Sequence, residues 1–188
     1  EAGASIPALF IAIKGENFDG NDYVAKAAEL GARAALVSRQ SDAAIPQIVV
    51  TDTERALADL ATVAQRDRRT RVVAITGSNG KTSVKTLTLA IFERAGSTYA
   101  TPGNRNNEIG MPLAVLDAPE DAAFAIYEMG TGKPGDIAYL TRIAPPDIAL
   151  VNNVASAHLE RMGSLLEIAN TKAAVYDDLS TDGVAAIN

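Results

Sequence analysis

A glycine-rich turn carries the clearest chemistry in this sequence. It reads Gly-Ser-Asn-Gly-Lys-Thr at positions 77–82 and follows an apolar run at 72–75. Glycines let successive backbone N–H groups point at phosphate oxygens, and the helix that follows adds its positive dipole end. Lys81 is expected to neutralise the β- and γ-phosphates of ATP, and the Thr82 hydroxyl to bind magnesium. The predicted nucleotide-binding residues are Gly77, Ser78, Asn79, Gly80, Lys81, Thr82 and Ser83.

This turn is shorter than the usual phosphate loop. The usual pattern has a glycine where Ile75 stands, so the sequence predicts a shortened variant that begins at Thr76. The alternative is a tight strand-to-helix turn that exposes Lys81 and Thr82 by chance. The apolar run before the turn and the amphipathic pattern after it favour a phosphate loop.

Two further side chains follow predicted strands of the same sheet. Glu128 ends the run 123–127, and His158 follows the run 148–152 after a short loop. Ligands of open parallel sheets bind beyond the carboxyl ends of the strands, so both side chains are candidate metal ligands beside Thr82. The alternatives are a solvated glutamate at a strand end and a structural histidine.

The stretch 101–110 is rich in amides and glycines and follows another predicted strand. Asn and Gly favour ordinary turns, but loops at this sheet edge also supply many binding residues. Both interpretations stay open on composition alone. Lys172 lies in a helical pattern with Ile168 and Val175, where a lysine is typically a solvated surface group.

Strand and helix patterns alternate along the chain, which predicts an α/β protein with a mostly parallel sheet. One predicted helix has Val84, Leu87, Ile91 and Ala95 on its apolar stripe. The charged stretch 65–71 is interpreted as a solvated linker, and a phosphate-binding basic patch is the alternative. Strands are predicted at 9–13, 34–38, 47–50, 72–75, 98–101, 123–128, 148–152 and 184–188, and helices at 22–30, from 52 or 53, up to 95, at 135–143 and at 164–179.

Composition narrows the class of protein. The chain has 188 residues and a formal net charge of -6, which argues against a nucleic-acid partner. It has no cysteine, so disulfides and thiolate metal sites are excluded and Mg²⁺ is the natural metal. Neither an apolar run of about 18 residues nor a signal peptide is readable, and a cytoplasmic protein is expected.

Six motifs are spread along the chain. They are Thr76-Gly-Ser-Asn-Gly-Lys-Thr82, Thr101-x-Gly103-Asn-x-Asn106-Asn107-x-Ile-Gly110, Glu128-Met-Gly130, Asn152-Asn153 followed by His158-Leu-Glu160, Leu9-Phe-Ile-Ala-Ile-Lys-Gly15 and Asp19-Gly20-Asn21-Asp22-Tyr23. Together these motifs resemble the Mur ligases, and the resemblance covers essentially the whole chain. Family members often have a histidine where Asn21 stands in the last motif.

The resemblance implies a fold of three domains. Residues 1–69 would form a small α/β domain that binds a UDP-sugar, and 70–188 an incomplete ATP-binding domain of the P-loop type. A carboxyl-terminal domain would be absent, and the strand pattern at 184–188 also suggests a truncated chain. Such a fragment is expected to bind ATP weakly and to lack turnover.

The resemblance also implies a reaction and its residues. The amide-rich loop favours the member that adds D-alanyl-D-alanine to UDP-N-acetylmuramoyl-tripeptide through an acyl phosphate, as a monomer in peptidoglycan synthesis. Thr82 and Glu128 would hold one Mg²⁺ and His158 a second, and Lys172 matches a lysine that can carry a carbamate. Other Mur ligases and folylpolyglutamate synthetase are the alternatives, ahead of a kinase or GTPase. The implied catalytic residues are Lys81, Glu128, His158 and Lys172, and the implied substrate-binding residues are Asn21, Asn104, Asn106 and Asn107.

Overall fold

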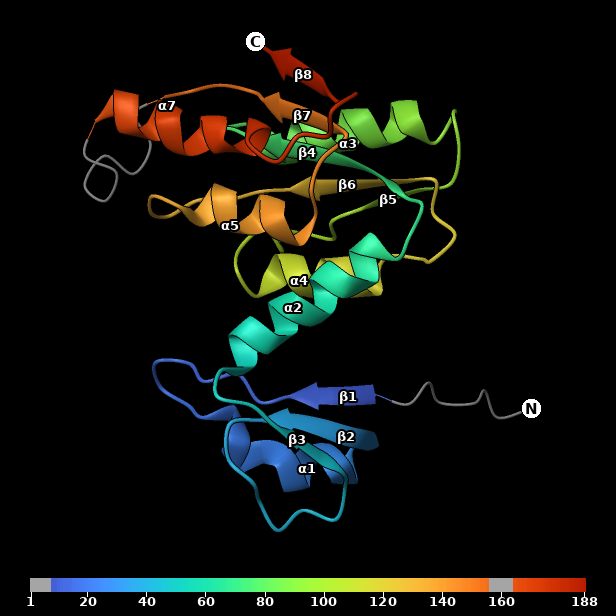
Figure 1. Ribbon diagram of the computed structural model, residues 1–188, viewed down its shortest axis with the longest axis vertical. Helices are drawn as coiled ribbons and strands as arrows, with labels where there is room; N and C mark the ends of the chain where they lie inside the picture. Colours follow the sequence, from blue (N-terminus) through green and yellow to red (C-terminus); the bar gives the residue numbers. More distant parts are fainter. Residues whose placement is uncertain (1–7, 156–163) are drawn as a thin grey trace. The chain divides into compact units, whose positions relative to one another are not determined.

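A computed structural model describes residues 8–155 and 164–188. The chain divides into two compact units, Glu1–Leu57 and Ala58–Asn188, which Figure 1 shows in sequence colours. Within the described ranges, no helix has both the length and the apolar character needed to cross a membrane.

The first unit is a small parallel sheet with a helix. Strands β1 (Ala8–Ile11), β2 (Ala32–Val37) and β3 (Gln47–Val49) lie in the order β1-β2-β3. A 3-10 turn, η1 (Gly20–Tyr23), leads into α1 (Val24–Glu29), and α2 (Thr53–Arg66) begins at the end of the unit. Its buried core consists of Ala12, Val24, Ala35 and Val37.

The second unit is built on a five-stranded sheet whose neighbouring strands are all parallel. The strand order is β5-β6-β4-β7-β8, so β4 lies in the middle. After β4 the chain forms β5 at one edge, returns to form β6 between β5 and β4, and then adds β7 and β8 on the other side of β4. The strands are β4 (Arg71–Thr76), β5 (Thr98–Ala100), β6 (Phe124–Glu128), β7 (Ile148–Val151) and β8 (Val184–Ile187).

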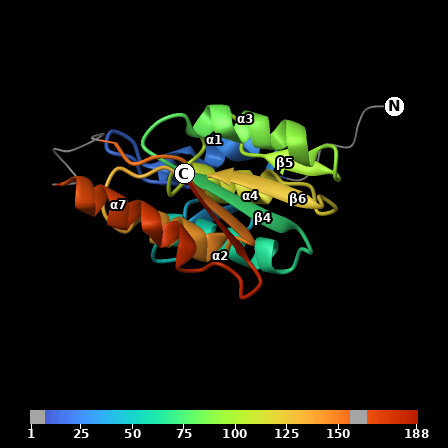
Figure 2. The ribbon, with the colours of Figure 1, turned by 90° about the horizontal axis from the view of Figure 1, so that it is seen from above.

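Helices cover both faces of this sheet. On one face, Val84, Leu89 and Phe92 of α3 (Lys81–Phe92) pack against β4 and β6. Residues of α2, α4 (Gly110–Asp117), α5 (Asp136–Ile143) and η2 (Ala174–Tyr176) share a core with the opposite face. Figure 2 shows α3 on one side of β4 and β6 and α7 (Leu165–Ala173) on the other. The predicted α/β fold with a parallel sheet is therefore confirmed.

The predicted apolar stripe of α3 is wrong at two positions. Leu87 and Ile91 are each 66% exposed, although they were expected to face the core. The face that meets the sheet is the one that carries Lys85, which is only 5% exposed. A buried lysine in the sheet-facing row hid the true face of the helix from a hydrophobic pattern.

The linker predicted at 65–71 is also wrong. Gln65 is buried, and its Oε1 accepts a hydrogen bond from the Tyr127 hydroxyl at 2.9 Å. Thr70 is buried too, and its hydroxyl donates to the Ala122 carbonyl at 2.8 Å. Between them Arg66, Asp67 and Arg69 are exposed, whereas Arg68 is partly buried and donates to the Val115 carbonyl at 2.6 Å. The stretch therefore packs within the second unit, and each buried polar group in it has a hydrogen-bond partner.

Candidate nucleotide and metal site

The predicted phosphate loop joins the buried central strand β4 to α3. Gly80 is the residue before the first turn of α3 and has a φ of 73°, a left-handed conformation that favours glycine. A Cβ at Gly80 would also lie 3.0 Å from Nδ2 of Asn152. The first amides of α3, from Lys81 to Ser83, have no carbonyl one turn earlier in the helix and can serve an anion.

Two asparagines at the end of β7 hold the loop in shape. Nδ2 of Asn152 donates to the Asn79 carbonyl at 2.9 Å, and Oδ1 of Asn153 accepts from the Asn79 amide at 3.0 Å. The Ser78 amide donates to the Asn153 carbonyl at 3.0 Å. The amides of Ser78 and Asn79 are thus engaged within the protein, and the role of these two residues in phosphate binding stays a prediction. The two asparagines after β7 were not among the predicted site residues, although their place directly after a buried strand was a usable signal.

Lys81 and Thr82 extend from the first turn of α3. Nζ of Lys81 donates to the Gly77 carbonyl at 3.0 Å, so the side chain folds back over its own loop. The Thr82 hydroxyl donates to Oε2 of Glu128 at 3.1 Å. The predicted pairing of a phosphate-loop threonine with a carboxylate at the end of β6 is therefore present in the structure.

Glu128 is 2% exposed and is held by three side chains. Besides the Thr82 hydroxyl, Nδ2 of Asn106 donates to Oε1 at 2.8 Å, and Nζ of Lys85 lies 3.2 Å from Oε2. Asn106 was a predicted site residue, whereas Lys85 was missed. A lysine in a helical pattern gives no signal of burial, because most such lysines are on the surface.

The donor set at Glu128 fits magnesium. A hydroxyl and a carboxylate are hard oxygen ligands, and Mg²⁺ in nucleotide sites commonly has few protein ligands and several from phosphate and water. No cluster of three or more acidic or histidine side chains is found in the described ranges. His158, the predicted ligand of a second metal, lies outside the described residues.

Lys172 is buried on α7, contrary to the solvated position that the helical pattern suggested. It is 4% exposed, and burial together with the charge on Lys81 lowers the pKa of its ammonium to about 8. A larger fraction of neutral amine is therefore present near pH 8 than for a lysine on the surface.

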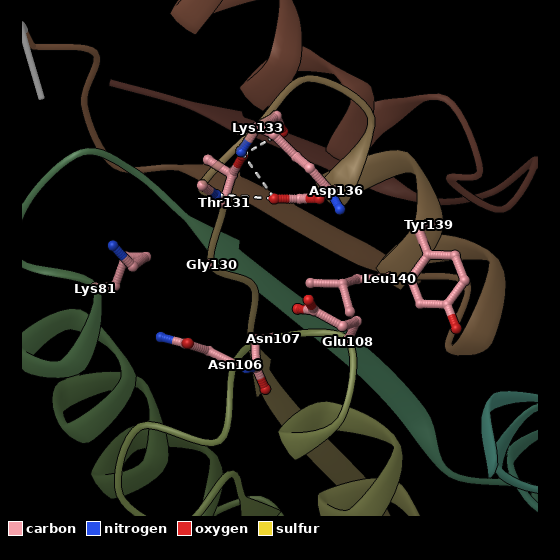
Figure 3. Close-up of a pocket in the computed structure, with 11 residues that line it drawn as sticks. Lys81, Asn106, Asn107, Glu108, Gly130, Thr131, Lys133, Asp136, Tyr139 and Leu140 are labelled. Carbon is pink, nitrogen blue, oxygen red and sulfur yellow. Dashed lines mark hydrogen bonds between the residues drawn. The ribbon is translucent and has the colours of Figure 1, made fainter. Parts of the chain in front are cut away.

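A cavity of about 720 Å³ opens beside the phosphate loop. Figure 3 shows Lys81 and Asn106 on one side of the end of β6, with Lys133 and Asp136 beyond it. Oδ2 of Asp136 accepts from the Lys133 amide at 2.9 Å, which fixes the turn before α5. The lining residues are Lys81, Asn106, Asn107, Glu108, Gly130, Thr131, Gly132, Lys133, Asp136, Tyr139 and Leu140.

The other predicted substrate residues differ in their surroundings. Asn107 lines the cavity, and its Oδ1 accepts from the Gly110 amide at 2.7 Å, which caps α4. Asn104 is exposed and does not line the cavity.

Helix α4 was not predicted at all, because it is short and apolar on all sides and its hydrophobic residues show no clear helical period.

Asn21 belongs to the first unit and is 4% exposed. Its Nδ2 donates to Oδ1 of Asp19 at 2.7 Å and to the Ser38 hydroxyl at 2.9 Å, and its Oδ1 accepts from the amides of Ser38 and Arg39. Hydrogen bonds from Asn21 lower the pKa of Asp19. The amide therefore holds two loops of its unit together, and a contact with substrate stays a prediction.

Comparison with known proteins gives matches over the whole length of the chain. The Mur ligase middle domain matches residues 75–188, and the Mur ligase family catalytic domain matches residues 2–74. The chain is 44% identical over 180 residues to the UDP-N-acetylmuramoyl-tripeptide--D-alanyl-D-alanine ligase of Escherichia coli K12, covering 96% of the chain and 40% of that relative.

Solved structures agree. MurF from Acinetobacter baumannii superposes with a TM-score of 0.91 at 36% identity, over 95% of this chain and 40% of that one. MurF ligase from Thermotoga maritima, solved in complex with ADP, gives a TM-score of 0.90 at 35% identity, over 96% and 42%. The chain thus spans about 40% of the length of the relatives it matches.

Proposed function

The chain belongs to the Mur ligase family, and on that premise we propose that it works as part of an ATP-dependent ligase that joins D-alanyl-D-alanine to UDP-N-acetylmuramoyl-tripeptide. The observation that carries this proposal is the meeting of Thr82, Glu128 and Asn106 beside a phosphate loop. The chain is 44% identical in sequence to a relative named for this reaction, which supports the choice of acceptor.

The phosphate loop would bind ATP through its helix end and Lys81. We propose that the first amides of α3 and the Lys81 ammonium hold the terminal phosphates, with Lys81 exchanging its 3.0 Å bond to the Gly77 carbonyl for a phosphate oxygen. Thr82 and Glu128 would hold Mg²⁺. When bound, the metal would cancel phosphate charge that otherwise repels an approaching carboxylate.

The cavity beside Lys81 would receive the peptide end of the UDP-linked substrate. Its lining has two lysines, Lys81 and Lys133, and two acidic residues, Glu108 and Asp136, and Lys81 next to the phosphate loop suits a carboxylate that must approach an anionic phosphate. Asn106 and Asn107 add amide groups to the lining. Transfer of the γ-phosphoryl group to this carboxylate would give the acyl phosphate, and the amine of D-alanyl-D-alanine would then displace phosphate.

Lys172 would act as a carbamate. Its buried, partly neutral amine can attack CO₂, forming an N–C bond and releasing one proton, and the product is an anionic group. We propose that this group supports a second Mg²⁺ together with His158. Bicarbonate labelled with ¹³C should give a carbamate signal in the parent protein that Lys172→Met abolishes, and a wild-type protein without the signal would refute this role.

The remaining assignments complete the proposal. Residues 1–69 would bind the UDP-sugar with Asn21 and residues 70–188 the nucleotide, with Asn104 near the substrate. We place the enzyme in the cytoplasm as a monomer in peptidoglycan precursor synthesis.

The deciding experiment is an acceptor profile in the full-length parent. Phosphate release would be measured with ATP, Mg²⁺ and UDP-N-acetylmuramoyl-tripeptide, and with D-alanyl-D-alanine, diaminopimelate, lysine or glutamate as the acceptor. We expect release with D-alanyl-D-alanine alone. Release driven by one of the single amino acids would instead assign the chain to another Mur ligase or to a folylpolyglutamate synthetase.

Matched variants test the site itself. Lys81→Ala should lower turnover by about 100-fold or more, because it removes a cation aimed at the reacting phosphate. Lys26→Ala serves as the control, since Lys26 is exposed and its ion pair in the described part of the chain is with the exposed Glu29. The 188-residue chain by itself is expected to bind ATP weakly and to form no product, because closing parts of such enzymes complete the site.

A further inference from the structure

Lys85 has a place in the second unit that the proposed chemistry does not explain. It lies on α3, one turn after Thr82, and is 5% exposed. Its ammonium lies 3.2 Å from Oε2 of Glu128 and also donates to the carbonyls of Thr101 and Gly103, each at 2.8 Å. The three N–H donors of this ammonium thus meet three acceptors.

These contacts tie the Lys85 charge to the candidate metal ligand. Two of the three acceptors are backbone carbonyls of the loop that follows β5, and neither belongs to Glu128 or to Thr82. If the ammonium left Glu128 entirely, it would have to abandon both carbonyls in a buried environment, which is unfavourable. A cation at Thr82 and Glu128 would therefore have Lys85 as a permanent positive neighbour.

The charge balance has a consequence for what the site can bind. The Glu128 carboxylate carries one negative charge, Lys85 cancels it, and Thr82 and Asn106 are neutral. Counting these four described side chains, a free divalent cation would enter a site with no net negative charge, and the nearby Lys81 repels it further. A cation that arrives with a nucleoside triphosphate brings its own compensating anion.

We propose that Lys85 is a positioning residue that orients the Glu128 carboxylate and balances its charge, so that this site takes a divalent cation together with a nucleotide and not alone. The inference rests on the proposed function only in taking Glu128 as the metal ligand and the phosphate loop as the nucleotide site. It makes no use of the acceptor, so a failed acceptor profile would leave it standing.

The test is the binding of Mn²⁺, measured by electron paramagnetic resonance in the full-length parent at pH 8, where protons compete least with the metal. Wild-type protein should bind Mn²⁺ at least about 100-fold more weakly without a non-hydrolysable ATP analogue than with it. Lys85→Met should tighten nucleotide-free binding by about tenfold or more, and Lys85→Arg, which keeps the charge, should change it by less than about threefold.

Two controls separate the explanations. Glu128→Gln combined with Lys85→Met should lose the gain in Mn²⁺ affinity, because the ligand itself is gone. Unchanged or weaker nucleotide-free binding in a folded Lys85→Met variant would overturn the proposal. Should that variant not fold, the wild-type measurement decides: a nucleotide-free affinity within about tenfold of the nucleotide-bound one would overturn it equally.

Discussion

Replacing Glu128 with glutamine should destabilise the second unit strongly, because it breaks a buried ion pair while leaving the lysine in place. The Lys85 and Glu128 side chains are 7% and 2% exposed, and their charged atoms lie 3.2 Å apart. At an effective dielectric constant of about 20, two unit charges at this distance attract by roughly 5 kcal/mol. Desolvation offsets part of this attraction, and removing one partner of such a pair typically costs about 3–5 kcal/mol.

The assay must resolve the second unit from the first. Native-state hydrogen exchange of the amides of β4 and β6 reports the free energy of opening of the second unit, and the amides of β2 serve as an internal reference. In Glu128→Gln we expect opening of β4 and β6 to become easier by about 3 kcal/mol or more. Protection of β2 should stay as in the wild-type protein.

A double variant tests the cause. In Lys85→Met combined with Glu128→Gln, the buried charge is gone as well as its partner, so the double variant should lose clearly less stability than the sum of the two single variants. Full recovery is not expected, because the Thr101 and Gly103 carbonyls lose the Lys85 donor. If the two single changes cost less than about 1 kcal/mol each, or if their costs simply add, the pair does not stabilise the unit and the reasoning is refuted.

Three further predictions follow from single positions. Gly80→Ala should lower nucleotide affinity by roughly tenfold, because the alanine would be strained in a left-handed conformation and its Cβ would press on Nδ2 of Asn152. Gly31→Ala, with a φ of 101° and no neighbour within 4 Å, should lower stability by about 1 kcal/mol without changing nucleotide affinity, which titration with an ATP analogue checks. Tyr127→Phe should destabilise the second unit by about 1–3 kcal/mol in urea unfolding, because the buried Gln65 loses its donor, and a wild-type midpoint would contradict this. Because the pKa of Lys172 is about 8 in the folded protein, the unfolded chain binds a proton between about pH 8 and 10.5 that the folded chain does not, and folding stability should rise with pH across this window. Lys172→Met should flatten the rise, and an equal slope of stability against pH in both proteins would refute the assignment.

The main strands were predictable because burial on both faces leaves a continuous apolar run. The predicted strands at 72–75, 123–128 and 148–152 became β4, β6 and β7 of one parallel sheet. The polar residues at the ends of two of these strands could be placed at one edge by the same argument, and Thr82 does meet Glu128 there. The parallel topology therefore made part of the candidate site predictable as well as the fold.

What could not be predicted depends on exceptions to hydrophobic patterning. Lys85 is a charged residue in the sheet-facing row of α3, while Leu87 and Ile91 are apolar residues on its exposed face. Gln65 and Thr70 are polar residues that are buried, Gln65 in a hydrogen bond with Tyr127 and Thr70 in a hydrogen bond with the Ala122 carbonyl. In each case the buried polar group is stabilised by a partner far away in sequence, which no local pattern reveals.

The order of the strands explains why the site draws on such distant segments. Because β4 lies between β6 and β7, the loop that follows it is flanked by the ends of both strands. Side chains alternate along β6, so Ile126 packs against the α3 face of the sheet, Tyr127 against the opposite face, and Glu128 points again to α3, where Thr82 and Lys85 meet it. A one-residue shift of β6 against β4 would move the carboxylate to the opposite face, so the register that pairs Ile75 with Glu128 is as necessary to the candidate metal site as the carboxylate itself.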